Sequence, residues 1–242
     1  MWIVPAKKLI ETAHAASNEK TQYYLNGVCI SAPDGDGDIW LAATDGHIMS
    51  VHRLTEETDG DLITSEREII ISTDAIKQIA AMLKAACKGG RYSPVTALVR
   101  LEYTTPATAD GRSRPMRISL TASDGAVLSV IETPAEIDGT FPDWARVLPD
   151  VSEPGTPPSI GLNPALLIRL QKASGGHHIA ITFGRNEGGP NHQQAPSLVT
   201  ASVAPGWYGV FMPMSAKPVT AIFKPVDTLA TAPPAPATDV RV

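Results

Sequence analysis

The chain has 242 residues and a formal net charge of −5 at pH 7. Hydrophobic residues make up 43% of it and charged residues 19%, which is typical of a globular protein and not of a disordered or membrane-spanning one. Tight binding to nucleic acid needs clustered Lys and Arg, so the negative charge limits any contact with DNA to a local and weak one.

The chain shows no sign of a membrane or secretory destination. No apolar run approaches the roughly 20 residues that a membrane-spanning helix needs. Residues 1–8 hold a proline and two lysines but lack the apolar stretch of a secretory signal. We therefore expect a cytoplasmic protein without a membrane partner. Cys29 and Cys87 are the only cysteines, and their apolar surroundings predict two buried free thiols, not a disulfide or a metal site.

The first predicted elements are a short apolar strand at 2–4 and a helix with Pro5 in its first turn, where a missing N–H removes no hydrogen bond. Two strands follow and meet at Asp45-Gly46. An Asp-Gly pair between alternating apolar runs predicts a tight hairpin, because glycine tolerates the positive φ of the turn.

The next elements repeat this order. An apolar strand at 68–72 leads into a helix that Ser72, Thr73 or Asp74 can cap. Apolar residues at three- and four-residue spacing form its predicted buried stripe. The stripe consists of Ile76, Ile79, Ala80, Leu83 and Cys87.

A repeated sequence marks the second hairpin. Residues 41–51, Leu-Ala-Ala-Thr-Asp-Gly-His-Ile-Met-Ser-Val, return at 120–130 as Leu-Thr-Ala-Ser-Asp-Gly-Ala-Val-Leu-Ser-Val, 79 residues later. A third, weaker copy has a strand at 159–162, a helix beginning near Pro164 and a turn at Gly206. The unit of strand, helix and three strands therefore occurs three times.

The three units predict an α+β protein with one complete domain and a half domain. Two units form a closed domain over residues 1–134, and the third stands alone as a half domain over residues 159–216. Residues 135–158 are proline-rich and acidic and are interpreted as a linker or crossover. Residues 217–242 hold five prolines and little apolar pattern, which predicts a mobile tail.

Five short segments carry a resemblance to a known family. Residues 4–11 (Val-Pro-Ala-Lys-Lys-Leu-Ile-Glu), 23–27 (Tyr-Tyr-Leu-Asn-Gly) and 43–47 (Ala-Thr-Asp-Gly-His) resemble the middle domain of the bacterial DNA sliding clamp, the beta subunit of DNA polymerase III. Residues 141–149 resemble the clamp's crossover into its last domain, with Trp in place of a usual Tyr, and residues 210–214 resemble its C-terminal strand. The resemblance implies a shortened clamp fold that keeps the middle domain and the second half of the last one.

The resemblance also implies a function. A clamp is not an enzyme and needs no cofactor; it is a processivity factor that tethers DNA polymerase and other replication proteins to DNA through short peptide motifs. The alternative is a non-encircling, clamp-like module that recruits or competes for the same clamp-binding proteins.

The implied peptide pocket has apolar walls and a polar rim, a composition suited to a short, largely apolar peptide. Two departures from the family's pattern make the rim less positive: Ile48 replaces a usual arginine, and Ser215-Ala216 replaces a basic residue and leucine. The implied pocket residues are Leu25, Thr44, Gly46, His47, Met49, Pro142, Arg146, Val147, Val210, Met212, Pro213 and Met214.

The resemblance further implies a weak, sequence-independent contact between helix cations and double-stranded DNA. The implied DNA-facing residues are Lys7, Lys8, Lys77, Lys84, Lys88, Arg169 and Lys172. Family rings contain twelve repeat units, so a chain of three units would need four copies. We therefore expect a homo-oligomer of even number in which residues 159–216 form an interface.

The sequence gives little support for a metal site or a catalytic nucleophile. Residues 34–38 alternate Asp and Gly like a calcium loop, but Ile39 occupies the position where that loop needs glycine. His177-His178 has no third ligand at metal-like spacing, and no set of Ser, His and Asp predicts a nucleophile.

Overall fold

The computed structural model describes residues 1–32, 38–55, 62, 68–90, 92–104, 115–149, 161–176, 178–184, 195–202 and 204–213. The calcium-like segment, apart from Asp38, lies outside these residues, as do Met214, His177 and the predicted tail. None of the helices in the described part of the chain is long and apolar enough to cross a membrane.

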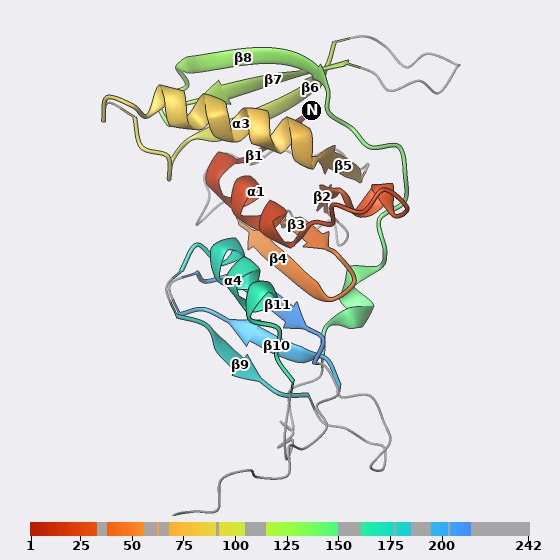
Figure 1. Ribbon diagram of the computed structural model, residues 1–242. Coiled ribbons are helices and arrows are strands. Elements are labelled where there is room, and N and C mark those ends of the chain that lie inside the picture. The colour runs from red at the N-terminus through yellow and green to blue at the C-terminus, as the bar shows by residue number, and fades with distance from the viewer. Residues whose placement is uncertain are drawn as a thin grey trace, which may run out of the picture.

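The described strands form two antiparallel sheets (Figure 1). The four-stranded sheet has the order β1 (Trp2–Pro5), β6 (Leu98–Tyr103), β7 (Pro115–Thr121) and β8 (Val127–Pro134). The seven-stranded sheet has the order β5 (Ile69–Ser72), β2 (Gly27–Ser31), β3 (Ile39–Thr44), β4 (Ile48–Leu54), β11 (Trp207–Phe211), β10 (Ser197–Thr200) and β9 (Ala180–Thr182).

The first two units exchange their first strands. β1 begins the first unit but pairs with β6 of the second, and β5 begins the second unit but pairs with β2 of the first. Residues 135–137 then continue past β5, where the Ile137 N–H donates to the Ile70 carbonyl at 2.8 Å. The two units are therefore joined by strand pairing as well as by their shared core.

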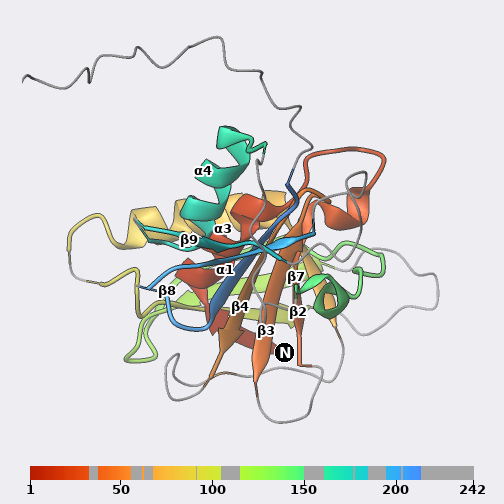
Figure 2. The same cartoon turned by 90° about the horizontal axis from the view of Figure 1, so that it is seen from below.

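The three α-helices within the described residues pack along one side of the strands (Figure 2). They are α1 (Ala6–Thr12), α3 (Thr73–Ala86) and α4 (Pro164–Ala173), and α1 contacts both of the others. Short 3₁₀ helices follow at η1 (Ala13–Ala15), η2 (Tyr23–Leu25) and η3 (Trp144–Val147).

The helix ends follow the capping residues in the sequence. Ser72 caps α3, because its Oγ accepts the Ala75 N–H at 3.2 Å. Asn163 caps α4 in the same way through Ala165, and Pro164 occupies the first helical turn as predicted. Pro5 differs from the prediction, since it lies just before α1 and ends β1.

The predicted stripe of α3 is correct for its three large apolar residues. Ile76, Ile79 and Leu83 are buried. Ala80 and Cys87 are only half-buried, because the helix turns its buried face toward Ala75 and Met82 instead. Cys29 is fully buried, and desolvation, followed by the charge of Glu68, raises the pKa of its thiol.

The three predicted hairpins are all present, and a glycine with positive φ stands at each turn. The φ values are 86° at Gly46, 81° at Gly125 and 79° at Gly206. In the first turn the Asp45 side chain also accepts two backbone hydrogen bonds through Oδ1, from the His47 N–H at 2.8 Å and from the Ile48 N–H at 3.0 Å. Local turn chemistry thus accounts for the repeat seen in the sequence.

The third unit does not stand alone, in contrast to the prediction. β11 pairs with β4, so the sheet of the first unit continues into the third. Six of the seven residues of β4 are buried, so the strand has apolar or internally bonded groups on both faces. The buried Trp207 Nε1 donates to Ser50 Oγ at 2.9 Å across this junction. An open edge on β4 would expose that strand, and β11 covers it.

Candidate peptide-binding surface

A separate apolar cluster lies on the face of the seven-stranded sheet opposite the helices. It includes Leu25, Met49 and Val210, which come from three distant parts of the chain. Met49 and Val210 are direct neighbours across the β4–β11 junction. All three side chains are at most 4% exposed, so they form the floor of this surface and not its rim.

The crossover between the second and third units forms one wall. Phe141 is buried in the cluster, and Trp144 packs against Trp40 with ring centroids 5.1 Å apart. Arg146 extends into solvent with 86% of its side chain exposed and pairs with Asp143 at 2.8 Å. In Figure 1 this green segment runs down the right-hand side from the upper sheet to η3. Pro142 and Val147 are also exposed there.

The end of β11 and the first hairpin form another part of the rim. The Met212 N–H donates to the His47 carbonyl at 3.0 Å, which fixes the two residues side by side. Met212 and Pro213 are half-buried, whereas Gly46 and His47 are exposed. The Thr44 hydroxyl forms its hydrogen bonds within the turn: Oγ1 donates to the Ile48 carbonyl at 2.7 Å and accepts the Gly46 N–H.

The structure therefore brings the described members of the proposed pocket, which exclude Met214, to one region, with apolar side chains below and exposed ones around them. Leu25, Met49 and Val210 are packed together; the crossover and hairpin residues flank them. Trp40, Trp144 and Phe141 belong to the same cluster, although they were not among the predicted pocket residues. Trp144 lies within a segment that carried the family resemblance, but the sequence held no signal that it would meet Trp40.

Arg169 was expected to face DNA, but its side chain is bonded to other parts of the protein. Its Nε donates to the His14 carbonyl at 2.9 Å, Nη2 donates to the Ala16 carbonyl at 2.8 Å and Nη1 pairs with the Asp45 carboxylate. Both charged side chains are largely enclosed, with 30% exposure for Arg169 and 13% for Asp45. Arg169 thus connects α4 to η1 and to the first hairpin.

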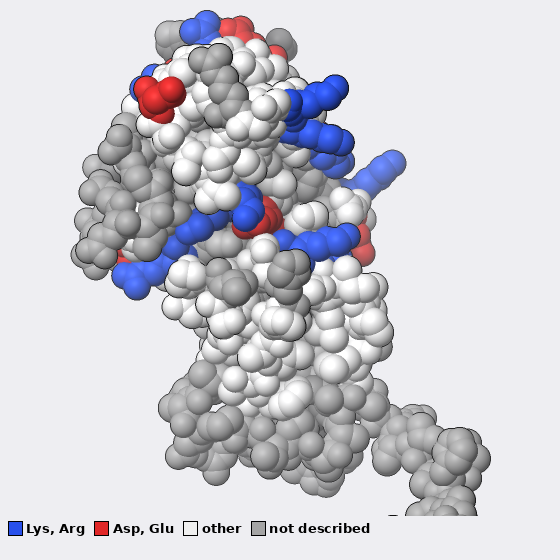
Figure 3. Space-filling view, turned by 90° about the vertical axis from the view of Figure 1, so that its left-hand side faces the viewer, with Lys and Arg blue, Asp and Glu red and all other residues white. Residues whose placement is uncertain are grey.

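The other proposed DNA-facing cations lie on the three described α-helices, except Lys88, which lies in the turn after α3. Lys7 pairs with Glu11 at 3.6 Å, and Lys77 pairs with Asp74 at 2.8 Å. Figure 3 shows lysine and arginine across the middle of one face and along its upper right side, with acidic side chains among them. Lys84, Lys88 and Lys172 are exposed, and Lys8 is half-buried.

Charges at the α1–α4 contact affect one another. Burial raises the pKa of Glu11, and Lys7 and Lys8 partly oppose that shift. Burial lowers the pKa of His14, and the positive charges of Lys172 and Arg169 lower it further. Both shifts result from the close packing of the helices. Among the residues that the structure describes, no three His, Cys, Asp or Glu side chains gather where they could hold a metal ion.

Comparison with solved structures identifies the fold. No family model and no curated protein matches the sequence. Solved structures do match. DNA polymerase III subunit beta from Pseudomonas aeruginosa is 16% identical, with a TM-score of 0.57 over 88% of this chain and 66% of its own length. Caulobacter crescentus pol III beta is 19% identical, with a TM-score of 0.59 over 89% of this chain and 66% of its own length.

The beta subunit of DNA polymerase from Streptococcus pyogenes gives the same result, at 16% identity and a TM-score of 0.58 over 88% of this chain. This chain spans only 65–66% of the length of these three proteins. It therefore has the α+β fold of the DNA polymerase III beta sliding clamps in a shortened form, as the sequence predicted.

Proposed function

We propose that this protein is a sliding-clamp-like DNA polymerase processivity factor without catalytic activity, which tethers replication proteins to DNA through a peptide-binding surface. The observation that carries the proposal is the β4–β11 junction: it unites Met49 with Val210 beneath the crossover that contains Phe141. An apolar floor with a polar rim is the arrangement that recognises short apolar peptide motifs. Such a role would be performed in the cytoplasm.

A synthetic clamp-binding peptide of the Gln-Leu-x-Leu-Phe kind should bind near Leu25, His47 and Met212. We expect micromolar affinity, or about −8 kcal/mol. Met212→Ala should weaken binding roughly tenfold, because it removes a flexible apolar wall beside the exposed His47 rim. Isothermal calorimetry measures both affinities.

A control for that measurement is Val95→Ala, which truncates a side chain that is 62% exposed in the turn before β6. It should leave the affinity unchanged. Absence of heat with the wild-type protein at high peptide concentration would contradict the peptide-binding surface.

The alternative function, a non-encircling module that recruits or competes for clamp-binding proteins, differs in assembly and DNA contact. The processivity factor is expected to be a homo-oligomer of even number and to contact double-stranded DNA through exposed helix lysines. Light scattering measures the first property. For the second, Lys84→Glu combined with Lys88→Glu should reduce DNA binding at low salt, since Lys84 is exposed on α3 and Lys88 is exposed in the turn that follows it. A monomer that binds peptide but not DNA would support the alternative.

A further inference from the structure

The carboxylate of Asp45 forms bonds in two directions. Its Oδ1 accepts the N–H groups of His47 and Ile48 inside the first hairpin turn, at 2.8 Å and 3.0 Å. Its Oδ2 accepts from Arg169 Nη1, which comes from α4 on the helix side of the sheet. The Asp45 side chain is only 13% exposed, although Gly46 and His47 beside it are exposed. One enclosed carboxylate therefore connects the turn to a helix.

The same turn is part of the rim of the peptide-binding surface. His47 is exposed there, and its carbonyl accepts the Met212 N–H at 3.0 Å. Two residues further along the strands, Met49 pairs with Val210 on the floor of the surface. A series of hydrogen bonds thus leads from α4, through the turn, to the rim.

Few other contacts position the tip of this turn. A Cβ added to Gly46 would meet no atom of the described residues within 4 Å. The His47 side chain is 72% exposed, and its Nδ1 lies 3.9 Å from Asp45 Oδ1. The position of the tip therefore depends on the two strands that lead into it and on the bonds of Asp45.

The guanidinium of Arg169 is fixed independently of Asp45. Its Nε donates to the His14 carbonyl at 2.9 Å, and its Nη2 donates to the Ala16 carbonyl at 2.8 Å. Both carbonyls belong to the backbone of η1 or of the residue that ends it. A planar guanidinium that is held by two of its nitrogens presents the third in a fixed direction, which an ammonium on a flexible stem does not. Arg169 therefore defines where the Asp45 carboxylate lies.

The second hairpin offers an internal comparison, because residues 120–130 repeat residues 41–51. Asp124 makes a corresponding turn bond, with Oδ1 accepting the Ala126 N–H at 3.0 Å. Gly125 has a φ of 81°, within a few degrees of the value in the first turn. Asp124 itself is exposed, however, whereas the aspartate of the first turn is enclosed.

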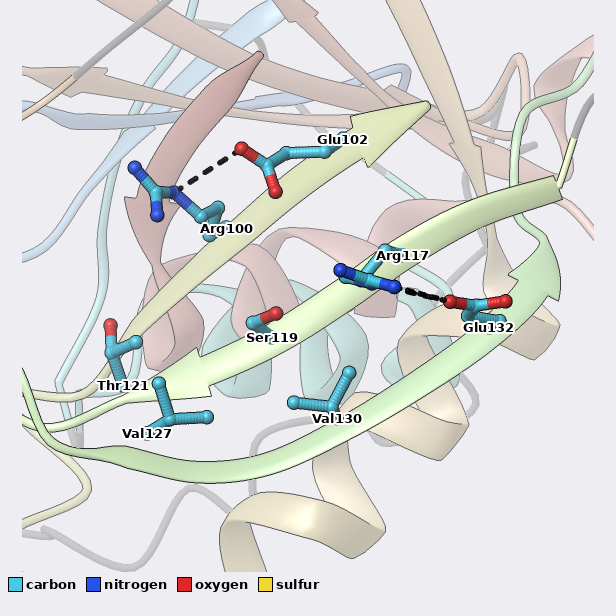
Figure 4. Close-up of a pocket in the computed structure, with 8 residues that line it drawn as sticks. All are labelled: Arg100, Glu102, Arg117, Ser119, Thr121, Val127, Val130 and Glu132. Carbon is cyan, nitrogen blue, oxygen red and sulfur yellow. Dashed lines mark hydrogen bonds and ion pairs between the residues drawn. The ribbon is translucent and has the colours of Figure 1, made fainter. Parts of the chain in front are cut away.

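No described arginine holds this second turn. The arginines on the outer face of the four-stranded sheet pair with glutamates instead (Figure 4), Arg100 with Glu102 at 3.6 Å and Arg117 with Glu132 at 3.0 Å. An Asp-Gly turn therefore forms without a guanidinium, so turn formation does not explain Arg169. The added contact belongs to the one hairpin of the two that borders the peptide-binding surface.

We propose that Arg169 is a positioning residue of the peptide-binding surface: it holds Asp45 from the helix side and so fixes the rim at His47 and Met212. The inference rests on the proposed function and deepens it, since Arg169 lies on α4 and not among the residues of the surface. A rim that is ordered in advance loses less conformational entropy when a peptide binds. Loss of Arg169 should therefore weaken peptide binding without removing a contact to the peptide.

Isothermal calorimetry of the full chain with the Gln-Leu-x-Leu-Phe peptide tests the proposal. Arg169→Met should weaken binding about three- to tenfold. Arg169→Lys should weaken it less, because an ammonium can still donate to Asp45. Asp45→Asn keeps an oxygen for the turn but presents an NH2 group that cannot accept from Arg169, so it should weaken binding to a similar degree. The double variant should bind no more weakly than Arg169→Met alone, since both changes remove the same contact.

Two controls separate positioning from a general loss of stability. Asp124→Asn makes the same chemical change in the second hairpin and should leave the peptide affinity unchanged. Ile118→Ala truncates a fully buried side chain of the four-stranded sheet, which lowers stability by a similar amount or more, and it should also leave the affinity unchanged. Circular dichroism at the temperature of the calorimetry shows that each variant is folded. Arg169→Lys and Asp45→Asn provide the same test if Arg169→Met does not fold.

Amide signals report on the rim without any peptide. Arg169→Met should shift the amide resonances of His47 and Met212 in a proton–nitrogen correlation spectrum and leave that of Ala126 in the second hairpin unchanged. Unchanged His47 and Met212 signals, wild-type affinity in folded Arg169 and Asp45 variants, or an equal loss of affinity in Ile118→Ala would overturn the proposal. A wild-type protein that binds no peptide would refute the proposed function instead, and the amide signals would still decide whether Arg169 positions these residues.

Discussion

Replacing Trp207 with alanine should lower the free energy of unfolding by about 3–5 kcal/mol. Trp207 is 2% exposed and packs at the β4–β11 junction. Its ring lies so close to Gly209 that a Cβ on that glycine would approach the ring to 2.8 Å. The truncation would leave a cavity and also free the Ser50 hydroxyl, which accepts the indole N–H. Urea unfolding followed by circular dichroism measures the loss.

Two milder variants separate the cavity from the hydrogen bond. Trp207→Phe keeps much of the ring volume and should cost less than the alanine change. Ser50→Ala leaves the buried indole N–H without its acceptor and should cost about 1–3 kcal/mol. A loss below about 1 kcal/mol for Trp207→Ala would mean that the third unit is not held by this junction.

Replacing Arg169 with methionine should destabilise the protein by about 1.5–3 kcal/mol, the usual range for hydrogen bonds to a charged group. The substitution keeps much of the side-chain volume but leaves the enclosed Asp45 carboxylate and the His14 and Ala16 carbonyls without the guanidinium. Arg169→Lys should recover only part of the loss, because one ammonium cannot reproduce three separately directed N–H groups. Urea unfolding at low and moderate salt measures the effect.

The matched control for Arg169 is Lys172→Met on the same helix. Lys172 is exposed, so its replacement should change stability by less than about 0.5 kcal/mol. Equal effects of the two substitutions would contradict the role of Arg169 in joining α4 to the first hairpin. DNA binding measured on both variants would also show whether Arg169 contributes to it at all.

The features that the sequence predicted correctly depend on local chemistry. The hairpins at Asp45-Gly46 and Asp124-Gly125 follow from a turn that needs positive φ, and the start of α3 follows from Ser72. Both signals act over a few residues, so a single sequence shows them. The clamp fold itself was recognised through short segments and agrees with the solved structures.

The features that the sequence did not predict are long-range. Nothing local indicated that β11 would cover the edge of β4, and the third unit was therefore wrongly expected to stand alone. The partner of Arg169 could not be predicted for the same reason, since Asp45 is 124 residues away in the chain. A cation on a helix has the same appearance in a sequence whether it faces DNA or a carboxylate. The pocket residues remain a prediction for the peptide-binding experiments above, and the domain limits remain a prediction.

The distance along the chain between β4 and its partner also affects the protein as it is synthesised. Trp207 pairs with His52, 155 residues earlier (207 minus 52). At about 5–20 residues per second, a ribosome needs roughly 8–30 s to make the strand that covers β4. During that interval a nearly complete first domain carries an open strand edge with apolar groups on both faces, a surface that other nascent chains can pair with. The edge of β4 is therefore exposed to pairing with other chains for the whole of that interval.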